Sequence, residues 1–429
     1  MSFFKDIIKK PADEYQFFLT MPRPMRVLLV TNMIYAFVLP VIDLFVAAYI
    51  MRNSQNPTLV VIYQLTVYTG IPFTFLINGF LLKKIKIANL YSFGMLLSGA
   101  SMIFMMSLGE LKAAGVAIAG LIMGCSFGFF WANRDFLALN TTNDDNRNYY
   151  YGLETFFYTI IAIVIPFVIG WFLTHAQSIE WVGDNVNRAY QLVTGAVFIL
   201  TIFSSWVIHR EKFQNPEQKK FVFFRFDKLW YKMLSLASLK GIAQGYIVTA
   251  PAILIMTLVG DENSLGIIQS VSGIITAIVL YLLGRITKPR HRIYIFAVGI
   301  AIFLIGTLAN GILFSASGVI VFMVCRVLFQ PLHDIAYFPI QMRVIDVVSK
   351  KENRSEYAYI FNHEFGLYIG RFVGLGVFIL LAYYVSETFA LKYALIIIAA
   401  LQLIAIPVAR HIIKEADKME QNSPVDRKS

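Results

Sequence analysis

The sequence predicts an all-α polytopic membrane protein with twelve transmembrane helices. Hydrophobic residues make up 58% of the 429 residues and charged residues only 15%. A soluble domain carries about a quarter charged residues, so this chain lacks the charge to coat a water-facing surface. The apolar residues also form long runs, such as 27–51 and 393–409. Such runs approach or exceed the roughly 20 residues that a helix needs to cross a bilayer.

Hydropathy, read with Pro, Gly and charged residues as breaks, divides the chain into two sets of six spans. The longest polar connection separates the sets, so we expect an N-terminal half over 1–208, a cytoplasmic linker over 209–229 and a C-terminal half over 230–429. The expected spans are 25–51, 57–82, 88–109, 113–139, 149–174, 188–208, 230–258, 264–284, 292–314, 318–342, 356–384 and 388–410.

The distribution of Lys and Arg predicts how these spans are oriented. If both termini are cytoplasmic, 30 of the 37 Lys and Arg residues lie on the cytoplasmic side and only Arg52, Lys112, Arg188 and Lys392 lie outside. This asymmetry predicts an N-in/C-in, multi-pass protein of the cytoplasmic (inner) membrane. Anionic lipid headgroups account for the net charge of +11, so the lipid bilayer is an expected partner and nucleic acid is not.

A weak internal repeat predicts that the two halves are pseudo-symmetric. Cys125 and Cys325 occupy equivalent places, and at the same offset "ANRDF" (132–136) meets "LHDIA" (332–336). The segment "DDNRNYYYGLE" (144–154) parallels "KENRSEYAYIFNHE" (351–364). The two cysteines lie inside apolar spans, which gives neither a disulfide framework nor a metal-ligand cluster, so no metal site is expected.

Two six-helix halves with a basic middle loop resemble the major facilitator superfamily, a family of membrane transporters. The segments "GFLLKKIK" (79–86) and "GRITKPRHR" (284–292) keep the glycine and the basic residues of the family's loop after spans 2 and 8, but they lack its acid. The resemblance implies alternating access, with spans 1, 4, 5, 7, 8, 10 and 11 around a central cavity. It also implies gating roles for Lys83 and Arg285 in these loops.

Charged residues inside the spans are the candidate functional residues, since each costs roughly 3 kcal/mol or more at the bilayer centre. All of them fall on spans that the resemblance places around the cavity. Four cations face five acids, so one carboxylate lacks a partner and, in a low-dielectric cavity, is suited to carry a proton. Asp43 and Glu154 are the favoured carriers. The expected ion-coupling residues are Asp43, Glu154, Asp334 and Glu364.

Substrate contact is expected from polar and aromatic side chains on the same spans. Arg326 and His333 are seven residues apart, as are Glu364 and Arg371, which places each pair on one helix face. The alternative for each is structural: ion pairing within the bundle, a hydrogen-bonded histidine, or an interfacial tyrosine. The expected substrate-binding residues are Trp131, Tyr151, Tyr158, Lys240, Gln244, Arg326, His333 and Arg371; the expected gating residues are Arg134, Asp135, Asp145, Arg147, Lys83 and Arg285.

The leading functional hypothesis is a secondary active transporter, a proton-coupled symporter of a small polar solute that is sugar-like or an organic anion. The sequence leaves H⁺ and Na⁺ both open as the coupling ion, and it predicts a monomer without a cofactor. The 37 Phe and 15 Met residues keep a second hypothesis open, a drug or amphipathic-compound efflux antiporter.

Other functional classes fit the sequence less well. A sensor or scaffold would carry an added soluble domain, whereas the segments outside the spans are short. The chain has no HExxH and no GxxxxGK[ST] motif, so nothing indicates an enzyme or an ATP-driven pump. The segment "GCSFG" (124–128) matches GxSxG but lies in the middle of an apolar span, where helix packing explains it better than catalysis.

Overall fold

The structure is a computed structural model that describes residues 11–178, 182, 185–215, 222–286, 291–354 and 356–421. Within these residues it contains helices and no β-strand, and twelve helical segments are long and apolar enough to cross a membrane, as predicted. The helices are α2 (Pro11–Thr20), α3 (Arg23–Ala36), η1 (Val41–Phe45), α4 (Val46–Ser54), α5 (Pro57–Leu81), α6 (Ile87–Ser107), α7 (Ala113–Thr141), α8 (Asp144–His175), η2 (Ala176–Ser178), α9 (Val186–Ile208), α10 (Lys228–Leu258), α11 (Glu262–Ile286), α12 (Arg292–Leu313), α13 (Ala316–Glu352), α14 (Glu356–Tyr384), α15 (Glu387–Gln402) and α16 (Ala405–Gln421).

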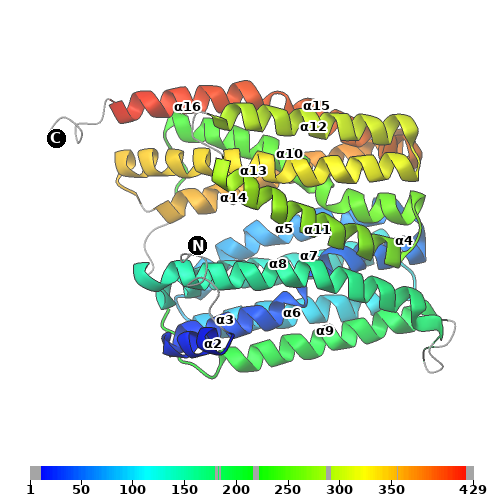
Figure 1. The fold of residues 1–429 in the computed structure, drawn as a ribbon, viewed down its shortest axis with the longest axis horizontal. Coiled ribbons are helices and arrows are strands. Elements are labelled where there is room, and N and C mark those ends of the chain that lie inside the picture. The colour runs from blue at the N-terminus through cyan, green and yellow to red at the C-terminus, as the bar shows by residue number, and fades with distance from the viewer. Residues whose placement is uncertain are drawn as a thin grey trace, which may run out of the picture.

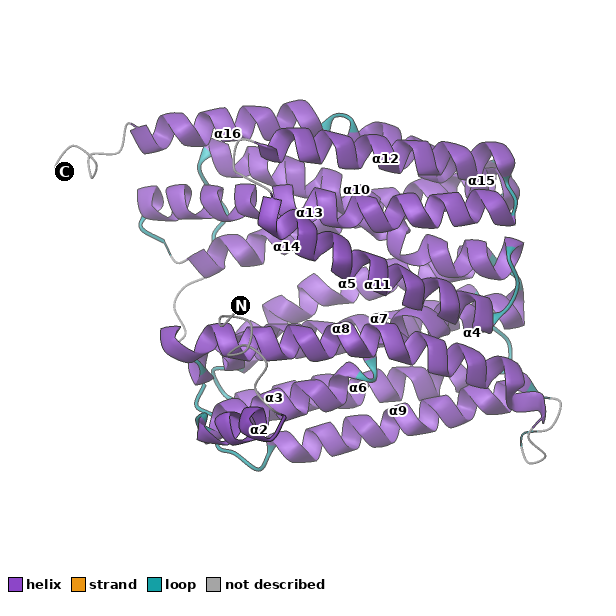
Figure 2. Cartoon of the chain, in the orientation of Figure 1, coloured by secondary structure: helices purple, strands orange, loops and turns teal. Residues whose placement is uncertain are grey.

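The spans run side by side and form two groups, which lie one above the other in Figure 1. The N-terminal group comprises α3 to α9 and the C-terminal group comprises α10 to α16; α5 and α8 of the first group pack against α14 and α11 of the second. We call the end of the bundle that holds α2 and the end of α16 the terminal end, and the opposite end the far end. Figure 2 shows short loops joining the helices at both ends.

Side-chain caps explain where several helices begin. At the start of α5, the Asn56 side chain accepts a hydrogen bond from the Leu59 amide at 3.3 Å, and Pro57 occupies the first helical position. At the start of α15, the Ser386 side chain accepts one from the Phe389 amide at 3.1 Å. Such caps satisfy amides that have no partner within the helix.

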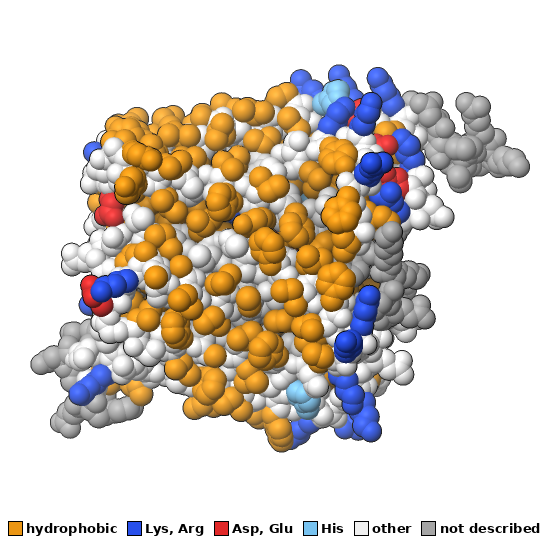
Figure 3. Space-filling view, turned by 180° about the vertical axis from the view of Figure 1, so that it is seen from behind, with side chains coloured by type: hydrophobic (Ala, Val, Ile, Leu, Met, Phe, Trp, Pro, Cys, Tyr) orange, Lys and Arg blue, Asp and Glu red, His pale blue; other side chains and the backbone are white. Residues whose placement is uncertain are grey.

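The surface has the polarity of a membrane-spanning protein. Figure 3 shows a broad apolar belt, with Lys and Arg side chains gathered along the right-hand edge, which is the terminal end in this reversed view. Exposed large apolar side chains on the spans include Phe167, Ile202 and Ile278. An apolar surface of this extent is suited to lipid, whereas monomers in water rarely expose one.

Glycines set how closely some helices approach. A Cβ on Gly370 would lie 1.9 Å from the Ser238 carbonyl oxygen, so α14 and α10 meet backbone to backbone. A similar approach joins the two groups: a Cβ on Gly266 of α11 would lie 2.3 Å from the carbonyl oxygen of Pro166 in α8, and Gly170 faces Gly266 one turn further along. Only glycine permits such contacts.

Two spans extend further than predicted. The tenth and twelfth were expected to end at residues 342 and 410, whereas α13 continues to Glu352 and the last helical segment reaches Gln421. Arg343 explains part of the difference: it pairs with Glu420 and lies 2.6 Å from Asp417 on α16. Charges that suggested a loop therefore lie on two helices that pack against each other.

Candidate functional site

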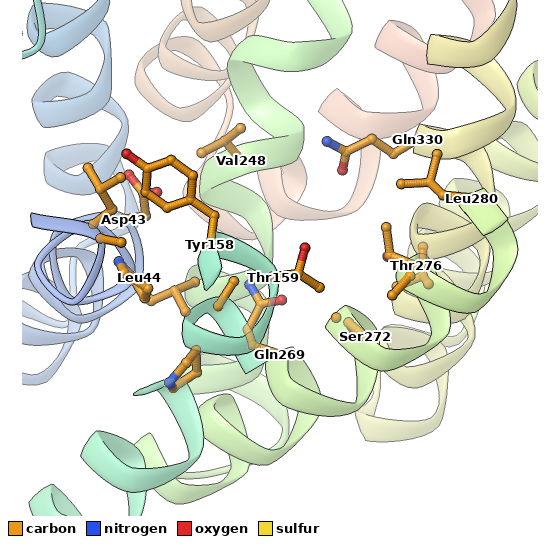
Figure 4. A pocket seen from close by; sticks show the side chains of 18 of the residues that line it. Asp43, Leu44, Tyr158, Thr159, Val248, Gln269, Ser272, Thr276, Leu280 and Gln330 are labelled. Atoms are coloured by element: carbon orange, nitrogen blue, oxygen red, sulfur yellow. The ribbon is translucent and has the colours of Figure 1, made fainter. Parts of the chain in front are cut away.

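A cavity of about 520 Å³ lies between the two helix groups. The lining residues on α8 and α11 recur at intervals of mostly three or four positions, which shows that a single face of each helix lines the cavity. Figure 4 shows Asp43 and Tyr158 on one side of the cavity and Thr276 and Gln330 on the other. The lining residues are Ala36, Leu39, Pro40, Asp43, Leu44, Trp131, Tyr158, Thr159, Ala162, Pro166, Val248, Gln269, Ser272, Gly273, Thr276, Ala277, Leu280, Arg326, Val327 and Gln330.

Asp43 lies where the first span departs from regular α-helix. The helix α3 ends at Ala36, and Pro40 precedes a π-helical turn, Val41–Phe45, that carries Asp43. Proline lacks an amide hydrogen and so disturbs the helix, and π-helical turns are frequent at functional sites. The Asp43 side chain is exposed to the cavity, and it forms no hydrogen bond or ion pair with any residue that the structure describes.

Arg326 reaches the same cavity from α13, in the C-terminal group. Gln330 follows it by one helical turn and lines the same cavity. The Arg326 Nε atom is buried without a hydrogen-bond partner, and no described acid pairs with the guanidinium. The cavity thus holds one acid and one cation, on opposite helix groups, that each lack a partner among the described residues.

Neutral polar groups account for most of the remaining polarity of the cavity. Gln269, Ser272 and Thr276 line it from one face of α11, and Thr159 lines it from α8. Tyr158 also lies here, and its hydroxyl is buried without a hydrogen-bond partner. These groups offer both donors and acceptors to a polar solute.

Glu154, the other favoured proton carrier, lies in a polar network within the N-terminal group. It forms an ion pair with Arg134 and accepts hydrogen bonds from Asn32 at 2.6 Å and Tyr150 at 3.2 Å. Tyr91 donates in turn to Asn32. Glu154 is therefore buried with several partners, and of the two favoured acids only Asp43 is unpartnered in the described part of the chain.

Arg134 and Asp135 make their polar contacts inside one helix group. Arg134 lies 2.7 Å from the exposed Asp135 carboxylate, and its guanidinium carbon lies 5.7 Å from the Trp131 ring centroid and 5.6 Å from that of Tyr151. Tyr151 therefore borders this network rather than the central cavity, while Trp131 reaches both. In this conformation the ion pair of Arg134 with Glu154 fastens α7 to α8, and among the described residues no ion pair of Arg134 or Asp135 bridges the two groups.

A second pocket of about 120 Å³ lies within the C-terminal group. Lys240 donates to Asp334 at 2.8 Å, and His333 lies 3.3 Å from the same carboxylate. Gln244 also lines this pocket, and Gln330 lines both this pocket and the central cavity. The smaller pocket is therefore a side chamber of the larger one, with its main charges already paired.

Arg371 continues the network of the side chamber. It donates to Gln244 at 3.0 Å and lies 3.6 Å from Glu364. Its guanidinium carbon lies 4.6 Å from the ring centroid of Tyr68, on α5 of the other group. Lys240, Asp334, Glu364 and Arg371 are thus gathered together, but as ion pairs.

The remaining expected gating residues lie near the terminal end. Lys83 follows α5 and is exposed. Asp145 and Arg147 belong to the first turns of α8 and Arg285 to the last turn of α11, and their side chains lie outside the described part of the structure.

Sequence reasoning missed the ion pair that joins the two groups. Arg52 on α4 donates to Glu262 on α11 at 2.6 Å, and Tyr190 donates to the same carboxylate at 2.8 Å. We call these three residues the far-end latch. Arg52–Glu262 is the only ion pair between the groups among the described residues, and Glu262 is fully buried. Both charges lie at the far ends of spans that border the cavity. Their equal depth along the bundle could have indicated from the sequence that they pair.

Gln269 and Gln330 also line the cavity, but they are not among the expected site residues, because charged and aromatic side chains were the main criterion. A polar uncharged residue recurring on the face of a cavity-facing span would have identified them. Among the described residues there is no group of three or more His, Cys, Asp or Glu side chains placed to hold a metal ion.

A bundle of twelve membrane-spanning helices with a cavity between its two groups has the architecture of a membrane transporter. The family model of the Major Facilitator Superfamily matches residues 27–374, and the chain belongs to this family. The predicted resemblance and the predicted all-α fold with twelve membrane-spanning helices are therefore confirmed.

Individual proteins support the same fold. The uncharacterized protein YqgE of Bacillus subtilis (strain 168) is 22% identical over 90% of this chain and 88% of its own. A bacterial homologue of the iron transporter ferroportin, in an inward-facing state, has a TM-score of 0.68 at 13% identity and covers 91% of this chain and 98% of its own. The POT family transporter PepTSo has a TM-score of 0.69 at 9% identity, with 92% and 99% covered.

Proposed function

We propose that the protein is a secondary active transporter that moves a small polar solute, sugar-like or an organic anion, across the cytoplasmic membrane by proton-coupled symport. It works as a monomer by alternating access, with its halves (1–208 and 230–429), which the linker (209–229) connects, moving around the central site. The observation that carries this proposal is the cavity between the helix groups, in which Asp43 and Arg326 lack partners among the described residues. Such concave sites with a few placed polar groups are typical of small-molecule binding.

The positions of the polar contacts support an inward-facing orientation of this conformation. The far-end latch and the hydrogen bond from Thr58 to Glu387, at 3.1 Å, join the two groups at the far end. At the terminal end no ion pair joins the groups within the described ranges. On the face shown in Figure 3, Lys and Arg side chains gather along the terminal end, as the positive-inside rule expects of a cytoplasmic face. The N-in/C-in topology follows from this assignment.

Asp43 is the proposed proton carrier. Its carboxylate faces the cavity, while the acids Glu154, Asp334 and Glu364 are held by Arg134, Lys240 and Arg371. Because a low-dielectric cavity disfavours an unpaired charge, proton binding makes Asp43 easier to enclose when the cavity changes sides. The hydroxyls of Tyr35, Tyr63 and Tyr68 are among the groups within electrostatic reach of Asp43.

The test is Asp43→Asn in proteoliposomes, with a solute first chosen by a thermal-shift screen against sugars, organic anions, amino acids and drugs. The variant should abolish accumulation driven by a pH gradient and retain counterflow exchange. The matched control is Asp135→Asn, which changes an exposed acid outside the cavity. If Asp43→Asn accumulates the solute normally, Asp43 is not the carrier; if only a sodium gradient drives uptake, the coupling ion is Na⁺.

The apolar part of the cavity keeps an efflux antiporter for amphipathic compounds as the second candidate. Leu39, Leu44, Ala162 and Leu280 line the same space as the polar groups. For this candidate, amphipathic drugs rather than sugars or organic anions would raise the melting temperature, and an inward proton gradient would expel them from inverted vesicles.

A further inference from the structure

We infer that the solute is a hydroxyl-bearing monoanion, bound through its carboxylate to Arg326 and loaded together with one proton on Asp43. The inference rests on the proposed function and names the substrate class and the charge that one cycle moves.

The charges inside the bundle point to a single vacancy for an anion. Most cations on the cavity-facing spans already pair with an acid of the protein. The distance from nitrogen to oxygen is 2.8 Å between Lys240 and Asp334 and 3.6 Å between Arg371 and Glu364. These pairs are Arg134 with Glu154, Lys240 with Asp334 and Arg371 with Glu364. Arg326 is the cation of the cavity wall that has no acid among the described residues.

Arg326 is chemically suited to a carboxylate. A guanidinium presents its N–H groups as a planar fork that matches the two oxygens of a carboxylate. Its Nε atom is buried without a partner, and a buried charge without a counter-ion is costly. A solute carboxylate supplies the missing acceptor and the missing charge in one contact.

Charge balance limits the solute to one negative charge. In the empty cavity, the charges of ionised Asp43 and of Arg326 sum to zero, although the two groups form no ion pair. When a monoanion binds Arg326 and a proton neutralises Asp43, the cavity again has no net charge. The second charge of a dianion would find no unpaired cation in the described lining of the cavity. Lys240, in the adjoining side chamber, is already paired with Asp334. One proton and one monoanion therefore cross together without net charge movement.

The rest of the lining favours hydroxyl groups on the solute. Gln269, Gln330, Thr159, Ser272 and Thr276 surround the space with neutral donors and acceptors. A cavity of about 520 Å³ is within the usual range for small-molecule sites. A zwitterion would instead place its ammonium against Asp43, where it would compete with the proton and lead to exchange rather than symport.

The binding test uses compounds that differ in the carboxylate. D-gluconate is paired with D-glucitol and D-glucuronate with D-glucose, each at 10 mM, and the melting temperature of the purified protein is measured. At least one carboxylate should raise it while its neutral partner does not. Arg326→Gln should remove the shift and Arg326→Lys should reduce it at least threefold. The matched control Lys112→Gln, which removes an exposed cation at the far end, should keep it.

Transport then separates this inference from the proposed function. In proteoliposomes with a pH gradient, uptake of the bound anion should be the same at zero and at −100 mV potential. A binding shift that depends on Arg326 without proton-driven uptake overturns the proposed symport, and with it the proton on Asp43, but leaves the carboxylate site at Arg326 in place. Proton-driven uptake of glucitol or glucose, or of an anion in a potential-dependent manner, overturns the monoanion inference alone. A panel in which neither carboxylate stabilises the protein also overturns it.

Discussion

Replacing Glu262 with glutamine removes the acid of the far-end latch without changing its shape. Glu262 is fully buried, and it holds Arg52 and Tyr190 at 2.6 Å and 2.8 Å. Loss of one partner from a buried pair costs about 3–5 kcal/mol. Since the Arg52 side chain is 35% exposed and water replaces part of the interaction, we expect about 2 kcal/mol. This energy corresponds to roughly a thirtyfold change in the equilibrium constant between the two conformations, away from the one that is closed at the far end.

The assay measures the distance between the two groups at the far end by electron paramagnetic resonance. Spin labels are attached at Ala114→Cys and Tyr384→Cys, both exposed, after Cys125 and Cys325 are replaced by serine. Glu262→Gln should add a longer-distance population that wild type lacks. The matched control is Glu110→Gln, which breaks an exposed pair at the same end. An unchanged distance distribution in Glu262→Gln would refute the role of the latch.

Two further predictions concern packing and pH. Gly370→Ala should lower the melting temperature by several degrees, because its Cβ would meet the Ser238 carbonyl oxygen at 1.9 Å and overpacking costs about 1–3 kcal/mol; Gly376→Ala, with no atom within 4 Å, should match wild type. Burial acts to raise the pKa of Asp227, but the hydrogen bonds from Lys351 and the Leu229 amide, together with the positive charges of Lys351 and Lys228, outweigh it and hold that pKa below its ordinary 3.8. When folding lowers the pKa of a carboxyl group, that group stabilises the folded protein at pH values above its pKa in the unfolded chain. This stabilisation is lost as the pH falls through its pKa in the folded protein. Asp227→Asn should therefore lower the melting temperature at pH 7, and the gap from wild type should close below pH 3.8.

The membrane spans were predictable because lipid leaves few choices for the backbone. Every peptide group in the bilayer must be bonded internally, so each span appears as a long apolar run. The predicted ends of the tenth and twelfth spans were wrong, at the places where these helices continue beyond the apolar runs. Arg343 suggested a loop, but its pairs with Asp417 and Glu420 allow α13 and α16 to continue as packed helices. Partners distant in the sequence, rather than local propensity, set those ends.

The candidate site was predictable in part, for a similar reason. The cost of burying charge identified Asp43 and Arg326 without any structure. The same rule identified Glu154, whose partner Asn32 lies on another span and so could not be found by spacing within one helix. Helical spacing also placed Arg326 and His333 on one face, yet one lines the central cavity and the other the side chamber. Depth along the helix separates them, and periodicity does not report depth.

The backbone contact between Gly170 and Gly266 has a mechanical consequence. Two rigid bodies that tilt against each other move least where they touch and most at the greatest distance from that point. With the bare backbones of α8 and α11 meeting beside Glu262, this contact is the fulcrum of the movement that we propose. Because this contact lies nearer the far end than the terminal end, a given tilt displaces the terminal end by more than it displaces the far end.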